Sequence, residues 1–226
     1  MNTYIVATIK IWNIRNFHKI RKEINADWHL INDKKELILE RVNAIKPRYI
    51  FFPHWSWRIP EEIYTNFECV VFHMTDLPFG RGGSPLQNLI LRGINETKVS
   101  AIRVVKELDA GPVYLKRDLN LNGNAEEILI RCSDVTFSMI KYIIENQPSP
   151  IEQKGEPVVF KRRSPAESRL PDINDLAEIY NYIRMLDAEG YPKAFIDMNN
   201  LKLEFSKATM KRGHIVADVK IIPKSS

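Results

Sequence analysis

The sequence predicts an α/β protein with a Rossmann-like, mostly parallel sheet flanked by helices, followed by a small C-terminal subdomain of one helix and β-strands. Three observations support this fold class. Apolar segments without polar alternation recur in the first half, helix-like segments separate them, and a period of two residues appears after about residue 98. Strands of a parallel sheet are buried on both faces and therefore give continuous apolar runs. We place the first domain at residues 1–165 and the small region at 166–226.

The first half alternates strands and helices in the order that this fold requires. Buried strands are expected at 3–11, 26–32, 47–55 and 68–74. Apolar side chains at helical spacing predict helices at 15–24, 34–45, 60–67 and 85–93. Pro60 and Pro85 suit a first helical turn, and Gly93 suits a helix C-terminus.

The second half predicts a hairpin, a long helix and a β-rich tail. Residues 98–105 and 110–121 have the period of strands, and 124–147 has that of a helix with Asn124 as its N-cap. Proline and polar residues predict a linker at 148–171. A further helix is expected at 172–190, and short strands at 193–223 with turns at "MNN" and "KRG".

The composition is that of an ordinary globular protein. Of the 226 residues 44% are hydrophobic and 27% charged, and no run of eighteen apolar residues suggests a membrane span. Cys69 and Cys132 lie in apolar surroundings and predict buried reduced thiols in a cytoplasmic protein. The net charge is +5, but the basic residues are spread out, so we expect neither a nucleic-acid nor a membrane partner.

Several classes of site lack their sequence signals. No glycine-rich turn follows the first strand, as a dinucleotide-binding protein would need, and "GRGGSP" lacks the Lys-Ser/Thr of a nucleotide phosphate loop. His54, His73 and the two cysteines have no metal-ligand spacing, so no metal is expected.

The stretch "FHMTDLPFGRGGSPLQNLI" (72–90) is the most informative part of the chain. His73 ends an apolar strand, and ligands of open α/β sheets bind at the carboxyl ends of strands. A histidine side chain can accept a proton near neutral pH. Taken alone, His73 also fits a structural histidine bonded to a loop carbonyl, and Asp109 fits an aspartate that organises a β-turn before Gly111.

Together with the loop, these residues resemble the formyltransferases that use N10-formyltetrahydrofolate. The resemblance is carried by His73, by "TDLP" and "RGG" after it, by Pro85 and by "LDAG" at 108–111. It implies that His73 is the catalytic base and Asp109 its supporting acid. It also implies contacts to the formyltetrahydrofolate cosubstrate from residues of the loop and the acidic turn: Leu77, Pro78, Arg81, Gly82, Gly83 and Leu108.

One position departs from the family. An asparagine usually stands two residues before the histidine and holds the formyl oxygen, and this chain has Val71 there. Another hydrogen-bond donor could replace it: Asn13, Asn88, Thr75 or protonated His73. Otherwise the protein binds folate or a nucleotide without catalysis.

The resemblance also bears on the amine that accepts the formyl group. About fifty-five residues follow Pro171, which favours the sugar N-formyltransferases over the tRNA enzymes with their larger C-terminal barrel. We therefore expect the acceptor to be a nucleotide-linked 4-amino-4,6-dideoxy sugar of a pseudaminic-acid-like pathway, preferably linked to UDP, or else to dTDP. Methionyl-tRNA formylation is the alternative, and a homodimer is one option for assembly. The expected acceptor contacts are Lys10, Trp12 and Asn13, at the end of the first strand, and Thr75.

Overall fold

The computed structural model describes residues 1–224, which form two compact units. The first unit contains residues 1–82, 97–119 and 130–159, and the second contains 83–96, 120–129 and the chain from Phe160 onward. The predicted boundary at residue 165 divides the chain by sequence. The two units divide the chain by packing, and each unit is made of three segments that alternate along the sequence.

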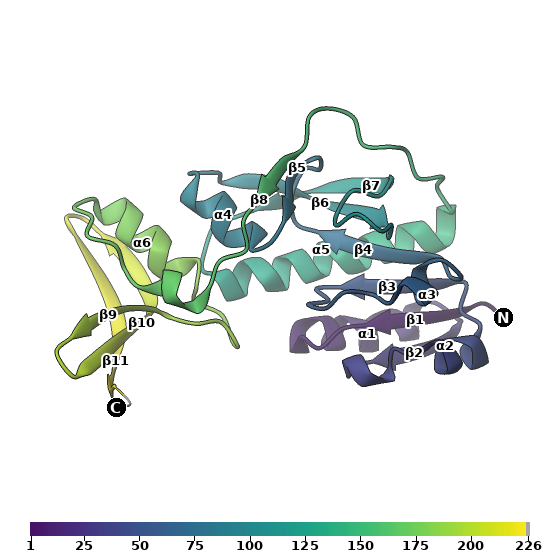
Figure 1. The fold of residues 1–226 in the computed structure, drawn as a ribbon, viewed down its shortest axis with the longest axis horizontal. Helices are drawn as coiled ribbons and strands as arrows, with labels where there is room; N and C mark the ends of the chain where they lie inside the picture. Colours follow the sequence, from purple (N-terminus) through teal and green to yellow (C-terminus); the bar gives the residue numbers. More distant parts are fainter. Residues whose placement is uncertain (225–226) are drawn as a thin grey trace. The chain divides into compact units, whose positions relative to one another are not determined.

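A six-stranded sheet forms the centre of the first unit, in the order β2-β1-β3-β4-β6-β7 (Figure 1). Its strands are β1 Thr3–Ala7, β2 Asp27–Ile31, β3 Tyr49–Pro53, β4 Cys69–His73, β6 Glu96–Arg103 and β7 Val113–Asn120. The four strands from β2 to β4 are parallel, and β6 runs antiparallel to β4. The predicted mostly parallel sheet is confirmed.

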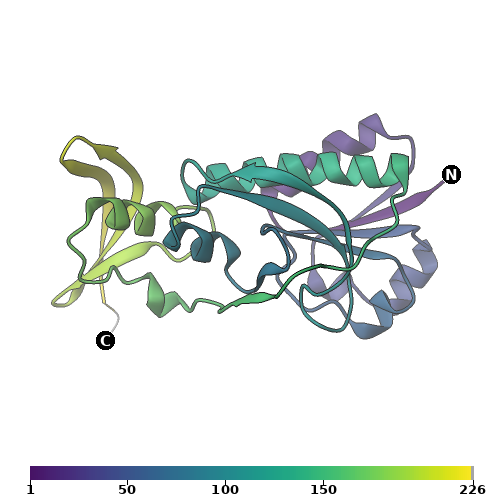
Figure 2. The ribbon, with the colours of Figure 1, turned by 90° about the horizontal axis from the view of Figure 1, so that it is seen from above.

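Helices cover both faces of this sheet. They are α1 Ile11–Glu23, α2 Leu39–Ile45, α3 Glu61–Tyr64 and α5 Ala125–Asn146, with a short 3-10 turn, η1 Lys34–Glu36. Figure 2 shows α1 and α5 on one side of the strands and α2 and α3 on the other. Strand residues such as Ile5, Ile50 and Phe51 are therefore fully buried, which explains the continuous apolar runs.

The first strand is shorter than predicted, and the helix after it begins earlier. β1 ends at Ala7, and Lys10 is the N-cap of α1. Trp12 and Asn13 therefore lie in the first helical turn and not at the end of the strand. The buried face of α1 includes Asn13 and Asn16, so its first turns carry polar residues that apolar spacing alone does not detect.

The predicted helix at 34–45 is also divided. Backbone at Leu37 and Ile38 is non-helical between η1 and α2. Leu37 is buried, but Ile38, expected on the same apolar face, is 48% exposed. The helical spacing was therefore correct only from Leu39 onward.

The second unit contains a three-stranded antiparallel sheet in the order β11-β10-β9. Its elements are α4 Pro85–Leu91, η2 Pro165–Ser168, α6 Leu176–Arg184, β9 Ala194–Met198, β10 Leu201–Lys211 and β11 His214–Pro223. The turns fall at Asn199–Asn200 and Arg212–Gly213, as predicted. α6 is shorter than the predicted 172–190 because it begins after Asp175, whose carboxylate accepts from the Ala177 N–H at 2.8 Å.

Two further findings complete the fold. The predicted linker contains β8 Val158–Phe160, which pairs with β5 Phe79–Gly82, a strand inside the predicted loop. Asn124 caps α5 as predicted: it exchanges hydrogen bonds with Glu127 in both directions, each 2.9 Å long.

The structure also bears on the cysteines and on membrane insertion. Cys69 and Cys132 are free thiols, Cys69 fully buried and Cys132 partly. Burial raises the pKa of both, that of Cys132 to about 12. None of the helices within residues 1–224 is long and apolar enough to cross a bilayer.

Candidate active site

His73 and Asp109 meet at the carboxyl end of β4. The His73 Nδ1 atom lies 3.6 Å from an Asp109 carboxylate oxygen, and the two side chains are 10% and 12% exposed. Thirty-six residues separate them in sequence, so the fold brings the two predicted catalytic residues together.

The hydrogen bonds of His73 indicate which of its nitrogens could accept a proton. Its Nε2 lies 2.7 Å from the Gly80 carbonyl oxygen, which can only accept, so Nε2 carries the hydrogen. In the neutral imidazole Nδ1 then has the lone pair, and it faces Asp109. Because 3.6 Å exceeds a hydrogen bond, Asp109 acts on this nitrogen mainly through its charge.

Asp109 is held by the backbone of the predicted loop. One carboxylate oxygen, Oδ2, accepts a hydrogen bond from the Gly82 N–H at 2.9 Å. Asp109 has a φ of +54°, a conformation that a non-glycine residue rarely adopts. Gly80 and Gly82 have φ values of 79° and 101°, so glycine is needed at both positions for β5 to reach His73 and Asp109.

Gln153, which the sequence did not single out, bonds to Arg81, Asp109 and Gly111. We call this group, together with His73, the His73–Asp109 corner. Its Oε1 accepts from the Arg81 Nε and Nη2 at 3.1 and 2.7 Å. Its Nε2 donates to the carbonyl oxygens of Asp109 and Gly111, both at 2.8 Å. Gln153 lies in the segment predicted to be a linker, where no spacing or motif marks it.

The predicted folate contacts differ in exposure. Leu77 is 1% exposed and belongs to the core in this structure, whereas Leu108 is 64% exposed beside Asp109. Pro78 follows a cis peptide bond, and its carbonyl accepts from the Val158 N–H. Gly83 belongs to the second unit, where a Cβ would lie 2.4 Å from the Arg162 Cβ. Close packing therefore accounts for a glycine at position 83.

Three of the four predicted acceptor contacts, Lys10, Trp12 and Asn13, follow the carboxyl end of β1, whereas Thr75 follows β4. The Trp12 ring lies 6.1 Å from that of His54, and the Lys10 Nζ lies 5.6 Å from the centre of the Trp12 ring. Burial and then the Lys10 charge lower the pKa of His54 to about 4. The register pairs Pro53 of β3 with Phe72 of β4, which places His54 at the same edge of the sheet as His73.

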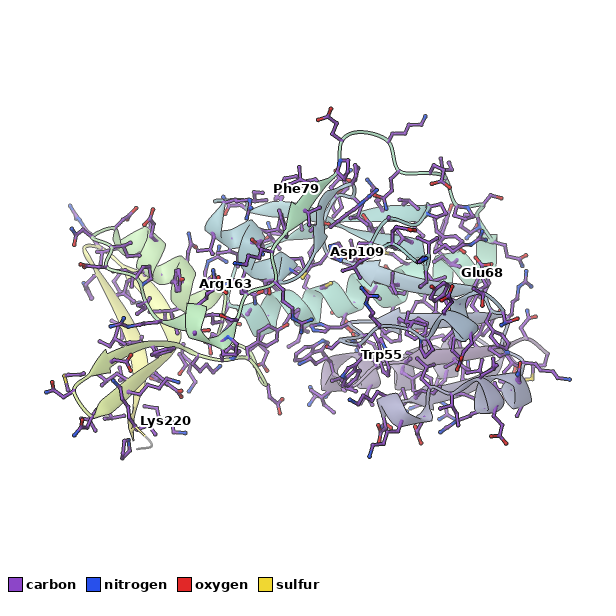
Figure 3. All side chains as sticks on the ribbon, in the orientation of Figure 1. Trp55, Glu68, Phe79, Asp109, Arg163 and Lys220 are labelled. Carbon is purple, nitrogen blue, oxygen red and sulfur yellow. The ribbon has the colours of Figure 1, made fainter. Side chains whose placement is uncertain are left out.

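Two tryptophans extend this aromatic group. Trp55 and Trp57 contact each other at 4.9 Å between ring centres, and the Lys34 Nζ lies 5.7 Å from the Trp57 ring. The indole N–H of Trp55, labelled in Figure 3, is buried without a hydrogen-bond acceptor. The run "PHWSW" directly after a buried strand was the available sequence signal for these residues.

The four candidate replacements for the family's asparagine are unequally placed. The Asn13 amide nitrogen already donates to the Thr8 hydroxyl and the Pro53 carbonyl, both at 3.0 Å. In the second unit the Asn88 amide nitrogen faces three backbone carbonyl oxygens. Thr75 is fully buried, with its hydroxyl 3.4 Å from the Gly80 carbonyl oxygen. His73 is the fourth candidate.

Val71 itself packs as an apolar residue. It pairs with Phe52 and Ile102 on the neighbouring strands and contacts the buried cluster around Ile50. It lies two residues before His73 on β4, so both side chains point to the same face. Within residues 1–224 no group of three or more His, Cys, Asp or Glu side chains is arranged to hold a metal.

His73 at the end of a parallel strand, the facing Asp109 and the glycine-rich loop lie at the sheet edge where ligands of open α/β sheets bind. A family model for the C-terminal domain of methionyl-tRNA formyltransferase matches residues 165–222. A solved structure of a methionyl-tRNA formyltransferase from Clostridium thermocellum is 54% identical, with 99% of this chain and 100% of that chain covered and a TM-score of 0.97. The chain therefore belongs to the formyltransferase family.

Other relatives refine this placement. Methionyl-tRNA formyltransferase of Bacillus subtilis is 27% identical over 195 residues, which cover 79% of this chain and 61% of that protein. The chain thus spans about three fifths of the length of this curated relative. A sugar N-formyltransferase of a Shewanella species is 13% identical, with 96% of each chain covered and a TM-score of 0.68, which shows the fold alone. The relatives give no support to the expected sugar acceptor.

Proposed function

We propose that the protein transfers the formyl group of N10-formyltetrahydrofolate to the amino group of methionyl-tRNA. The observation that carries the transfer reaction is the His73–Asp109 pair, in which Nδ1 lies 3.6 Å from a carboxylate oxygen. The acceptor rests on the relative with 54% identity and on the match of residues 165–222.

The reaction can be followed at named atoms. The acceptor amine attacks the formyl carbon, and an oxyanion forms on the formyl oxygen. His73 Nδ1 takes a proton from the attacking nitrogen, and the Asp109 carboxylate stabilises the imidazolium that results. The bond between the formyl carbon and N10 then breaks, His73 returns the proton to N10, and tetrahydrofolate leaves.

Protonated His73 is the donor that we favour for the oxyanion. The amide of Asn13 and the hydroxyl of Thr75 are already bonded inside the first unit. The imidazolium, in contrast, gains a new N–H at Nδ1 at the moment when the oxyanion needs stabilisation. Val71 contributes no hydrogen bond, so part of the family's usual stabilisation is absent here.

The folate is expected to lie along the loop after β4. Pro78, Arg81 and Gly82 are half-buried and Leu108 is exposed, so these four residues can contact the folate, whereas Leu77 is buried. Arg81 offers a guanidinium for a carboxylate of the folate tail.

The charge of the last hairpin supports an RNA acceptor. Residues 201–224 contain six Lys and Arg against two Asp and Glu. Among them Lys211, Arg212 and Lys220 are exposed (Figure 3 labels Lys220). Basic side chains on an exposed hairpin suit phosphate contacts. With methionyl-tRNA as the proposed acceptor, a nucleic-acid partner is proposed where the sequence predicted none.

A nucleotide-linked 4-amino sugar is the second candidate acceptor. The aromatic group of Trp12, His54 and Trp55 lies at the sheet edge where His73 stands, and aromatic rings stack on nucleobases. UDP- and dTDP-sugars carry such a base, but so does the 3′ end of a tRNA.

A formyl-transfer assay with both acceptor classes tests the proposal. Purified protein is incubated with N10-formyltetrahydrofolate and either charged methionyl-tRNA or a panel of UDP- and dTDP-linked 4-amino sugars. We expect release of tetrahydrofolate with methionyl-tRNA. Turnover only with a sugar nucleotide would reassign the acceptor. Binding of folate without turnover on any acceptor would instead indicate the non-catalytic alternative that Val71 raises.

A further inference from the structure

The segment from Ile151 to Val159 crosses the first unit as an exposed strap. The Ile151 backbone pairs with Val113 through two hydrogen bonds of 2.7 and 2.9 Å. At its other end the Val158 N–H donates to the Pro78 carbonyl. Within these nine residues Gln153 alone is half-buried, and the other eight are exposed. Gln153 is thus the strap residue whose side chain packs into the first unit.

The side-chain amide of Gln153 has all its hydrogen-bonding capacity in use. Its two hydrogens go to the Asp109 and Gly111 carbonyls, and its oxygen accepts two bonds from Arg81. A primary amide has two donors and one oxygen with two lone pairs, so no further partner can be added. Such complete pairing fixes the orientation of the amide and of the groups around it.

The turn that Gln153 holds is strained and close-packed. Asp109 has left-handed backbone dihedral angles, and a Cβ on Gly111 would lie only 1.8 Å from the Arg103 carbonyl oxygen. Hydrogen bonds to this turn come from two groups. The Gly82 N–H donates to the Asp109 carboxylate, and the Gln153 amide donates to the carbonyl oxygens of Asp109 and Gly111. Strain of this kind persists only where surrounding contacts impose it.

We propose that Gln153 is a positioning residue, which sets the Asp109 carboxylate against His73 and holds the Arg81 guanidinium beside it. The catalytic part of this inference rests on the proposed formyl transfer. The geometric part, that one amide joins the 109–111 turn to Arg81, does not.

Two substitutions separate the donor and acceptor functions of the amide. Gln153→Glu keeps an oxygen for Arg81 but removes both donors, and it places a carboxylate against two carbonyl oxygens. Gln153→Met removes both functions at similar volume. We expect kcat to fall on the order of 10-fold or more in both variants, because small displacements of catalytic groups are costly. The KM of the formyl donor should rise several-fold in Gln153→Met, where Arg81 loses its acceptor, and less in Gln153→Glu.

A double-mutant cycle distinguishes positioning from a merely structural role. If Gln153 acts through Asp109, Gln153→Met should lower kcat much less in an Asp109→Asn background than in the wild type. Gln147→Met is the matched control, because Gln147 also accepts a hydrogen bond from an arginine, Arg48, at 2.5 Å. It should leave kcat and KM unchanged. Equal kcat losses in both backgrounds, or a Gln147→Met loss as large as that of Gln153→Met, would overturn the proposal.

Amide hydrogen exchange provides a readout that does not depend on activity. Gln153→Met should increase exchange at residues 109–111 in the full-length protein, while exchange in β1 and β3 stays as in the wild type. Faster exchange together with an inactive wild type would refute the proposed function and leave the positioning contact supported. Unchanged exchange would refute the positioning contact even if the wild type is active.

Discussion

The His73–Asp109 corner and the C-terminal sheet are built in opposite ways. In the corner, two nearly buried side chains bond to Gly80 and Gly82 of β5, and Gln153 from a second segment bonds to the Asp109 carbonyl. In the C-terminal sheet, the register places Val219, Ile221 and Met198 on one face, and all three are at least 48% exposed.

This difference suggests a division of labour. Proton transfer requires groups fixed to within a fraction of an ångström, and a corner inside a doubly covered sheet provides that. Binding of a large anionic partner requires accessible surface and charge, and a sheet with an open face provides those. Paired substitutions in the two regions test this division.

The largest expected effect is on stability. Phe51 is fully buried in β3, and Phe51→Ala should lower the free energy of unfolding by about 3–5 kcal/mol. Ile221 is 60% exposed in β11, so Ile221→Ala should change it by less than about 1 kcal/mol. Urea denaturation followed by circular dichroism measures both. Equal losses would show that the C-terminal sheet is as tightly packed as the parallel one.

The next effect is on catalysis. Asp109→Asn removes the negative charge that faces His73 Nδ1 and should lower kcat on the order of 100-fold, because acid–base assistance typically contributes that much. Asp218→Asn is the matched control on β11, where Asp218 forms an ion pair with the exposed Lys207 at 2.9 Å. It should leave kcat unchanged. Wild-type turnover by Asp109→Asn would remove this carboxylate from the mechanism.

A smaller effect concerns pH and His54. The pKa of His54 is lowered to about 4 by burial and by Lys10, so the unfolded chain binds more protons than the folded one between pH 6.5 and 4. Stability should therefore decrease as pH falls through this window, on the order of 2 kcal/mol from this group. His54→Gln should remove that part of the slope, which denaturation midpoints at pH 7 and pH 4.5 would detect. If stability depended on pH in the same way in the wild type and in His54→Gln, the His54 ring would be solvated in the folded protein.

The smallest expected effect concerns acceptor binding by the hairpin. Replacing both Lys211 and Arg212 with Gln should raise the KM for methionyl-tRNA several-fold and reduce the dependence of log KM on log salt by up to about 2. The KM for the formyl donor should not change. Steady-state assays at several salt concentrations measure this, and an unaltered salt dependence would mean that these two side chains do not touch the acceptor.

The sequence predicted those parts of the molecule that depend on local pattern. Apolar runs located the parallel strands, Asn124 located the start of α5, and the order of "FHMTDLP" and "LDAG" located His73 and Asp109. It failed where long-range contacts decide the outcome. Asn13 and Asn16 are buried because they bond to distant residues, and Gln153 matters only because the strap places it over the 109–111 turn.

The acceptor could not be read from local pattern either. The C-terminal region is a helix followed by β-strands in both the prediction and the structure, and that outline fits more than one acceptor. The proposed acceptor depends instead on the match of residues 165–222 to a methionyl-tRNA formyltransferase domain. The predicted homodimer remains a prediction.

In the proposed reaction His73 transfers protons and does not merely support the fold. His73→Asn tests it when equilibrium binding of the formyl donor and the rate of formyl transfer are both measured on this variant and on the wild type. We expect a donor Kd within about threefold of the wild type and a kcat lower by at least about 100-fold. Turnover close to that of the wild type, or a loss explained entirely by weaker donor binding, would contradict it.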